Sequence, residues 1–414
     1  MIRRLSIGST LALAMLFGVS PALAAGWDTP ILYSAEHMGM GGAAIGYVDD
    51  PSAIYHNPAG IVHTQGLTLM ANATLILGSI TSSPTPEAEA HNIDSEPIRA
   101  VAPLIAVTYK FTDWFAAGLA FYPVASAGAV YKYKNSAGAS VENSTDVVFL
   151  EISPSLAFKL PGNVYLGAGY RISSVSLDRY AAPSATPLDF TLTGWNYEGL
   201  RFGAQWDPIP ELQLGIVYRH KTTTRITDDS GIVVIKDSPR KAWGDLVLPS
   251  KLGFGSRVNL HPLSFVLDLE YTWQSQNQEL VIDTDPNLGP LKVNSVFKWS
   301  DTVTLRTGVE YGLDDTYFIR GGFIFDTQAT HKEWPSAFGT PPGPSYTGTV
   351  GFGYKPDAPW DLNFALAYRV GAATVSTADI EKGQHDYPCA ACSKAGDYSL
   401  SMFGAYLDFT YSFH

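Results

Sequence analysis

Two cysteines near the end of this sequence have a spacing that could do chemistry. Cys389 and Cys392 are separated by two alanines, and this spacing serves disulfides, redox exchange and zinc sites. A zinc site would need two further ligands, and His385 is the only obvious neighbour. The start of the chain predicts export, and exported proteins usually hold cysteines as disulfides. We therefore predict a disulfide that stabilises a loop.

The other candidates for catalysis or metal binding lie in an N-terminal segment. Its histidines are scattered without the spacing of metal ligands, so we interpret them as polar residues of that segment: His37, His56 and His63. Asp49 and Asp50 could form an acid pair, but we favour solvated or salt-bridged carboxylates. An enzyme such as a lipase would need a Ser/His or acid cluster, and the sequence suggests none. We predict no enzyme, no metal site and no cofactor.

Residues 1–24 have the layout of a secretory signal peptide. Arg3 and Arg4 precede an apolar stretch from Ile7 to Val19, and Pro21 to Ala24 supplies a small-residue cleavage site. The alternative is an uncleaved anchor helix, but the stretch is shorter than the ~20 apolar residues that a spanning helix needs. We expect the mature chain to begin at Ala25.

Charge and composition narrow the class of protein. The sequence has 27 basic and 39 acidic residues, and it has no long cluster of lysine or arginine. A nucleic-acid partner is therefore not expected. Low charge, many aromatic residues and 38 glycines fit an exported transmembrane β-barrel, in which only alternate residues need be apolar. A secreted array of β-sandwiches could share this composition.

Turn signals alternate regularly between short and long connections. The short ones lie at 111–114, 160–163, 207–210, 259–262, 313–316 and 355–359. The long polar stretches lie at 80–98, 127–143, 178–189, 220–243, 277–294, 328–346 and 373–397. Six short and seven long connections imply fourteen strands, with all the tight turns on one side. This asymmetry is typical of bacterial outer-membrane barrels, and it predicts an all-β fold with antiparallel strands.

The predicted strands also alternate as a lipid-facing wall should. Between Phe265 and Trp273 the odd positions are apolar, while Asp268 and Glu270 fall between them. Charges on the second face require a wet or plug-filled lumen, because a charge in hydrocarbon costs several kcal/mol. We predict a network of inward charges that holds a plug, formed by Arg219, Arg306, Arg320, Arg369, Asp268, Glu270 and Glu310.

The plug would be the glycine-rich segment that precedes the strands. Glycines from Gly39 to Gly46, then Asp49 to Ala53, then Asn57 to Gly60 punctuate too often for a long strand or helix. This order resembles the hatch of the FadL family of outer-membrane transporters. The resemblance extends through Leu248-Pro249, Trp299-Ser300-Asp301 and Arg320-Gly321-Gly322. It implies a hatch at 25–65 and a barrel at 66–414.

The resemblance also implies a route for a ligand. In the family, a hydrophobic compound enters an extracellular pocket and leaves sideways where the third strand is kinked beside the hatch. The counterpart of that strand is 114–126, and its kink should lie between Pro123 and Gly128, although Pro123 could simply end the strand. Asn57-Pro58-Ala59 would sit near the gap and hold the hatch closed, or serve only as a turn.

Arg179 matches the position of the carboxylate-binding arginine of the family. Val175 and Leu177 precede it on the same face of the strand, so two apolar groups and a cation would line the lumen. The alternative is an arginine paired with a loop acid. A second family cation falls near Lys298 or Lys292, and Ala25-Gly26-Trp27 resembles the N-terminus that reaches into the pocket.

The predicted function is therefore hatch-gated transport of hydrophobic compounds across the outer membrane of a Gram-negative bacterium. Long-chain fatty acids are the expected ligands, and aromatic hydrocarbons are the alternative on the same fold. An open porin for polar solutes is a further alternative, but it would lack the glycine-rich plug. Expected partners are the ligand and outer-membrane lipid with lipopolysaccharide, and we expect a monomer.

Overall fold

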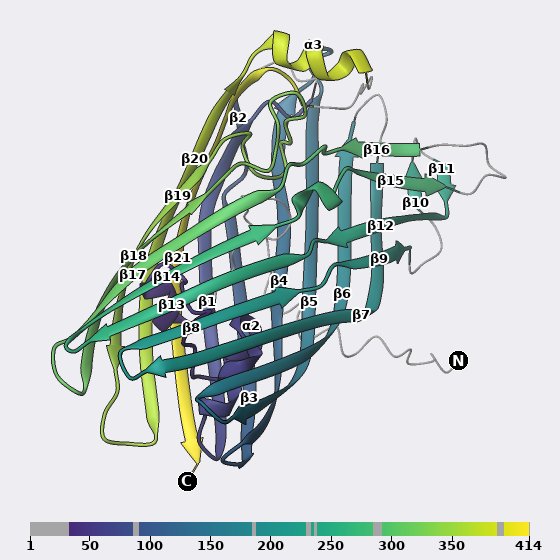
Figure 1. The fold of residues 1–414 in the computed structure, drawn as a ribbon. Helices are drawn as coiled ribbons and strands as arrows, with labels where there is room; N and C mark the ends of the chain where they lie inside the picture. The colour runs from purple at the N-terminus through teal and green to yellow at the C-terminus, as the bar shows by residue number, and fades with distance from the viewer. Residues whose placement is uncertain are drawn as a thin grey trace, which may run out of the picture.

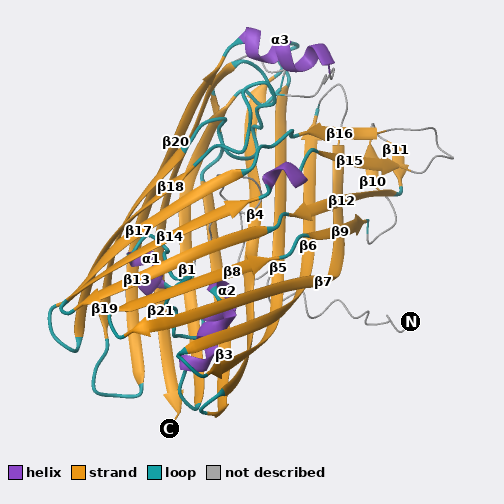
Figure 2. Ribbon diagram, viewed as in Figure 1, coloured by secondary structure: helices purple, strands orange, loops and turns teal. Residues whose placement is uncertain are grey.

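Strands with alternating apolar and polar side chains form one closed antiparallel sheet (Figure 1). The computed structural model describes residues 33–85, 91–183, 188–228, 233–235, 238–284, 292–386 and 393–413. Figure 2 shows short helical turns inside this sheet and one helix over its upper end. Among these residues, no helix is long and apolar enough to cross a membrane.

The helical elements are α1 (Ala35–Gly39), α2 (Ala53–His56), η1 (Pro58–His63), η2 (Gln274–Gln276) and α3 (Thr377–Asp386). The first strands are β1 (Leu67–Ser82), β2 (Ile93–Asp94), β3 (Ile98–Thr112), β4 (Phe115–Lys134), β5 (Ser140–Leu160), β6 (Val164–Ala182) and β7 (Leu188–Ile209). The middle strands are β8 (Leu212–Arg219), β9 (Thr222–Thr227), β10 (Val233–Ile235), β11 (Ser238–Arg240), β12 (Ala242–Leu248), β13 (Lys251–Leu260) and β14 (Leu263–Thr272). The last are β15 (Glu279–Thr284), β16 (Lys292–Val296), β17 (Thr302–Gly312), β18 (Tyr317–Asp326), β19 (Ser345–Tyr354), β20 (Trp360–Val375) and β21 (Gly396–Phe413).

The barrel wall has fourteen strands, as the turn pattern predicts. Four wall strands are each interrupted, so that β8 continues as β9, β12 as β13, β14 as β15, and β16 as β17. The last strand, β21, pairs with β1 from Leu67↔Phe413 to Thr81↔Ser399 and closes the wall. A closed wall leaves no unpaired edge, which is the condition for strands to span a membrane.

All six predicted short turns connect strands at one end of the barrel, and the long connections lie at the other end (Figure 1). Three of the predicted long connections are wrong in extent. The stretches 127–143, 178–189 and 220–243 are mostly strand, because β4 continues to Lys134, β6 continues to Ala182, and the third stretch contains β9, β10 and β11. Inward side chains hold β4 in place there, since Tyr131 is fully buried and its hydroxyl donates to the Ala337 carbonyl at 2.5 Å.

Side chains face outward or inward as the alternation predicts. Phe265, Leu267 and Leu269 are each nearly half exposed on the outer face, whereas Asp268 between them is buried. The other predicted inward charges are also buried or nearly so, namely Arg219, Arg306, Arg320, Arg369, Glu270 and Glu310. Several pair with one another across neighbouring strands, as Arg320 does with Glu310 at 2.7 Å. The wall therefore has an apolar outside and a polar, charged lumen at this level.

The N-terminal segment of residues 33–65, which we call the hatch, lies inside the barrel (Figure 1). Its backbone approaches the wall where two glycines pair across neighbouring strands: Gly167↔Gly203, Gly215↔Gly255 and Gly308↔Gly322. A methyl group on Gly322 would lie 2.1 Å from the Gly41 nitrogen, and one on Gly203 would lie 1.9 Å from the Asn57 side-chain oxygen. These glycines provide the room in which the hatch docks.

The ladder between β3 and β4 is incomplete. The two strands pair from Ile105↔Phe121 to Thr112↔Phe115. Above Phe121, β4 pairs with β5 alone, and residues 98–104 of β3 pair with β1 alone. A bulge at Val124 bends β4 here, because Pro123 pairs with Leu150 and Ala125 pairs with Phe149. The wall therefore has an interval without ladder hydrogen bonds, which we call the gap.

Candidate functional site

A cavity of about 320 Å³ lies at the upper end of the gap. One edge is formed by residues 96–98, at the start of β3, and the other by Gly128 to Val130 of β4. The Glu96 nitrogen donates to the Val130 carbonyl at 2.8 Å, so the two edges meet above the interval without pairing. The cavity also extends along β5, β6 and β7. Gly128 is required at this point, since a methyl group there would lie 2.2 Å from the Thr145 carbonyl oxygen.

Arg179 lines this cavity together with Gly128, so two residues that the sequence assigns to ligand and gate meet at one place. Its Nη1 donates to the carbonyls of Ser144 at 2.7 Å and Tyr180 at 2.6 Å. Its guanidinium lies 5.1 Å from the ring of Phe338, which belongs to the connection between β18 and β19. The backbone and one ring hold the guanidinium, and no loop acid is ion-paired with it among the described residues.

Val175 and Leu177 face the lumen, as their parity with Arg179 predicts. Both are buried in the largest apolar cluster of the described chain, which also contains Phe149, Leu192, Leu246 and Ile282 from the wall. The same cluster includes Val48, Ile54 and Ile61 of the hatch. The lumen beside the hatch is therefore lined on these strands by aliphatic and aromatic side chains, and such a surface favours an apolar ligand.

Asn57 bonds the wall backbone, as the sequence suggests, but it does so away from the gap. Its side-chain amide donates to the Ala204 carbonyl of β7 at 3.0 Å and to the Ile45 carbonyl of the hatch at 2.8 Å. Its oxygen accepts from the Ala59 nitrogen at 3.2 Å, which starts η1. The expected position of the Asn57 amide beside the kink is thus corrected: the glycine pair Gly167↔Gly203 places Pro58 and Ala59 against β6 and β7.

Tyr33 is the hatch residue that bonds the kinked strand. Its hydroxyl donates to the Pro123 carbonyl at 2.8 Å. The rings of Tyr33, Tyr55 and Tyr122 pack together behind the bulge, with centroids between 5.2 and 5.8 Å apart. Sequence reasoning missed this tyrosine cluster, because nothing in the spacing of the three residues shows that they meet.

A buried charge network lies next to the tyrosine cluster. Glu151 of β5 accepts from Arg171 of β6 at 2.8 Å and pairs with Arg201 of β7 at 3.5 Å. The hydroxyl of Tyr122 also donates to Glu151. All four side chains are buried. The alternation in β5, β6 and β7 could have identified them, since each charge stands between outward apolar neighbours.

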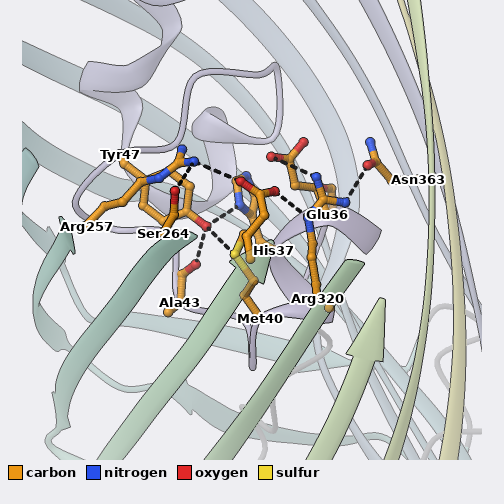
Figure 3. Close-up of polar contacts among 12 residues, drawn as sticks. Glu36, His37, Met40, Ala43, Tyr47, Arg257, Ser264, Arg320 and Asn363 are labelled. Atoms are coloured by element: carbon orange, nitrogen blue, oxygen red, sulfur yellow. Dashed lines mark hydrogen bonds and ion pairs between the residues drawn. The ribbon is translucent and has the colours of Figure 1, made fainter. Parts of the chain in front are cut away.

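A second network fixes the other side of the hatch (Figure 3). Arg320 of β18 donates to Glu310 at 2.7 Å and Asn363 at 2.7 Å, and it pairs with Glu36 of the hatch at 3.5 Å. Burial by itself raises the pKa of Glu36, but the nearby positive charges, of which Arg320 contributes most, together outweigh it and lower the pKa to about 2. Figure 3 also shows Arg257, which bonds Ser264 and lies 4.8 Å from the Tyr47 ring.

His37 ties α1 to the turn that contains the two aspartates. Its Nε2 lies 3.3 Å from Asp50, and its Nδ1 lies 3.1 Å from the Tyr47 hydroxyl. Burial lowers the pKa of His37, but the hydrogen bond and the charge of Asp50 raise it to about 9. Within the described residues no cluster of three metal-ligand side chains occurs. Asp50 is thus a salt-bridged hatch residue.

The remaining predicted residues divide into two groups. Ala25, Gly26, Trp27, Cys389 and Cys392 lie outside the described residues. Lys298 lies between β16 and β17 and is not among the residues that line the cavity at the gap. Its neighbours Phe297 and Trp299 belong to the apolar cluster that contains Val175 and Leu177.

Comparisons with known proteins agree on one family and one fold. A family model described as "Outer membrane protein transport protein (OMPP1/FadL/TodX)" matches residues 19–413. A FadL homologue from Pseudomonas aeruginosa is 18% identical with a TM-score of 0.73, and the match covers 94% of this chain and 100% of that one. The toluene transporter TodX from Pseudomonas putida is 16% identical with a TM-score of 0.70, over 92% and 98% of the chains.

A third similar structure is the toluene transporter TbuX from Ralstonia pickettii. It is 16% identical with a TM-score of 0.67, over 94% of this chain and 100% of that one. No match was found among curated protein sequences. At these identities, the structural likeness supports the barrel fold, and the family model supports membership.

Proposed function

The chain belongs to the OMPP1/FadL/TodX family of outer-membrane transport proteins, and we propose from this premise that it carries long-chain fatty acids out of its lumen through the gap between β3 and β4. The family and the fold are those of transport channels and not of enzymes. Members of this family are β-barrel proteins of the outer membrane. The chain is thus an outer-membrane transporter, and the ligand and the route are the parts that we propose.

The incomplete ladder is the observation that carries the proposed route. Strand pairing closes most seams of the described wall. It is also short between β7 and β9, which pair only at Thr193↔Thr227, and between β12 and β15, which pair only at two positions. The interval between β3 and β4 differs from these because it adjoins the bulge of β4 and the cavity. Between β3 and β4 this seal ends at Ile105↔Phe121. A hydrophobic compound that leaves here passes from an apolar lumen into lipid without crossing an aqueous space, which avoids the cost of hydrating it.

The cation at the cavity supports a carboxylate ligand. Arg179 lines the cavity that contacts both edges of the gap, and Val175 and Leu177 continue the same face with apolar surface. A guanidinium can bind a carboxylate through two parallel hydrogen bonds. Aromatic hydrocarbons are the second candidate, because two of the similar structures are described as toluene transporters.

Uptake of a labelled long-chain fatty acid, beside a labelled alkylbenzene, tests the ligand in cells that lack their own transporter. We expect uptake of the acid, and we expect Arg179→Ala to reduce it at least tenfold, the cost of about 1.4 kcal/mol, without changing uptake of the hydrocarbon. Arg225→Ala is the matched control, since Arg225 is an exposed arginine paired with Asp245 on the wall. Equal losses of uptake for both compounds would refute the assignment of Arg179 as a carboxylate site. Uptake of the hydrocarbon alone would show that the ligand is a hydrocarbon and not a fatty acid.

Removal of the bulge tests the route. Deleting Val124 together with Pro123→Thr should let β4 continue as a regular strand and bond β3 above Phe121. The faces of all later β4 residues stay the same, because Val124 is the extra residue of the bulge. We expect fatty-acid uptake to fall at least tenfold while the barrel still folds by heat-dependent gel mobility. Val124→Ala keeps the bulge and should keep uptake. Full uptake by the deletion variant would refute the proposed exit.

A further inference from the structure

Three tyrosine rings pack together beside the bulge of β4. Tyr33 and Tyr55 come from the hatch, and Tyr122 comes from β4 immediately before Pro123. Tyr33 and Tyr122 are fully buried. A compound that passes from the hatch to the gap at this point must therefore move the hatch tyrosines and Tyr122 apart.

Arg201 contacts both partners in this arrangement. Its Nη1 donates to the Ile54 carbonyl of the hatch at 2.6 Å and to the Tyr122 oxygen at 2.8 Å. Its guanidinium also lies 5.6 Å from the ring of Tyr55. Since Arg201 belongs to β7, a single side chain links the hatch to β4 across the inner face of β5 and β6.

Glu151 stabilises this linkage through ion pairs and a hydrogen bond. Its carboxylate holds Arg201, Arg171 and the Tyr122 hydroxyl at once, and the whole group is shielded from solvent. A buried charge that loses its partner is costly, so the network persists only while its geometry is kept. A displacement of the Ile54 carbonyl removes one acceptor from Arg201 and disturbs the contact with Tyr122.

The hatch end of the linkage belongs to the apolar cluster inside the barrel. Ile54 belongs to the same apolar cluster as Val175 and Leu177, and Tyr55 packs against that cluster. An apolar ligand that inserts among these side chains must displace some of them, because the cluster is closely packed.

We propose that Arg201 is a positioning residue that couples the hatch to the exit, by holding the Ile54 carbonyl and Tyr122 together until a ligand binds. Insertion of a ligand moves Ile54, Arg201 loses its hatch acceptor, and Tyr122 separates from Tyr33 and Tyr55. This inference rests on the proposed function, because it takes the gap as the exit.

Hydrogen exchange followed by mass spectrometry tests the coupling on the purified, ligand-free protein. Arg201→Met keeps the side-chain length, removes the donors and leaves Glu151 paired with Arg171. We expect amides of residues 122–130 in β4 to exchange at least tenfold faster than in the wild type, with β13 and β14 unchanged. We expect Arg201→Lys, which keeps one charged donor, to restore part of the protection.

Arg320→Met is the matched control. Arg320 also pairs with the hatch, through Glu36, and its removal leaves Glu310 paired with Arg257. It should loosen α1 without changing exchange in β4. Equal effects of both variants on β4, or wild-type exchange in Arg201→Met, would overturn the proposal.

Uptake kinetics provide a second readout. Arg201→Met should raise the maximal rate of uptake at least twofold and leave the half-saturating concentration unchanged, because the exit and not the binding surface is altered. If Arg201→Met does not fold, Tyr122→Phe removes the same contact without changing charge, and it must also speed exchange in β4. A wild type that takes up no hydrophobic compound would refute the proposed function, whereas the exchange data would still decide the coupling.

Discussion

Charged and hydrogen-bonding neighbours determine whether buried side chains of the hatch are protonated. His37 is the clearest case, since it is fully buried and lies between Asp50, Tyr47 and His56, with Glu36 next to it in sequence. A protonated His37 balances the charge of Asp50, which would otherwise lie inside the barrel without a positive partner at this position. The tie between α1 and the Asp49-Asp50 turn is therefore charged at neutral pH.

This protonation gives the hatch a dependence on pH. The folded pKa of His37, about 9, lies above its unfolded value, so its contribution is fully present below about pH 6.5 and is lost as the pH rises through 9. The shift corresponds to about 3 kcal/mol. We expect the unfolding temperature of the detergent-solubilised protein to fall between pH 6.5 and pH 10, and to fall less in His37→Gln. Identical pH profiles for the two proteins would contradict this assignment.

Residues of the lumen also show what alternation can and cannot reveal. The inward positions of Asp268, Glu310 and Arg320 follow from their place between apolar neighbours, and the structure confirms them. Their ion-pair partners could not be predicted. Alternation along a strand shows which face of the sheet a side chain occupies, but it shows neither its level along the barrel axis nor which residue of the next strand it meets. For the same reason Asn57 could be predicted to bond the wall, whereas its acceptor on β7 could not.

Among the elements, the wall strands carry paired glycines where the hatch backbone touches them. Gly308↔Gly322 receives Met40 and Gly41, and Gly215↔Gly255 receives Ile45 and Gly46. Paired glycines weaken a sheet, since they add backbone freedom and no packing. Contact with the hatch offsets that loss.

Two adjacent glycines of β18 allow the effect of hatch contact to be measured separately from the effect of a glycine in a strand. A methyl group on Gly322 would meet the Gly41 nitrogen at 2.1 Å, whereas one on Gly321 would meet nothing within 4 Å. We expect Gly322→Ala to lower the free energy of unfolding by about 1–3 kcal/mol through overpacking. Gly321→Ala should leave it unchanged. Urea titration in detergent measures both, and equal stability of the two variants would show that the hatch does not depend on this contact.

The prediction of elements succeeded where turns are tight and failed where strands continue into connections. Gly162 and Asn163 adopt positive φ in the short turn between β5 and β6, so their residue types indicate it directly. The short turn after β4 has comparable signals, since Gly138 also has positive φ and Asn135 accepts from the Ala137 nitrogen. The predicted connection is nevertheless too long, because Lys132 to Lys134 read as a polar loop although they are strand. The bulge in β4 was predictable because Pro123 lacks a backbone donor.

At the scale of the whole molecule, the hatch occupies part of the inside of the barrel (Figure 1). Its segments contact strands on both sides of the barrel, from β7 through β14 and β19 to β21. We therefore expect the hatch to interrupt the continuous water path that an open porin would have.

Planar-bilayer recordings of ion conductance test whether the hatch blocks the barrel. We expect the wild type to conduct ions at least tenfold less than a variant that lacks residues 33–65, because removal of the hatch leaves a lumen lined by hydrated arginines and carboxylates. Comparable conductance of both proteins would favour an open porin. The Arg179→Ala variant should conduct as the wild type does, since it leaves the hatch in place.

The hatch and the barrel also divide their charges unequally. Residues 33–65 include Glu36, Asp49 and Asp50 but no lysine or arginine. The arginines that bond this segment, Arg201 and Arg320, belong to strands far later in the chain. Before those strands are placed, the segment has neither its counter-charges nor its glycine docking sites. We therefore expect the order of folding to oppose the order of synthesis, so that this early segment acquires its structure last, inside a wall that has already closed.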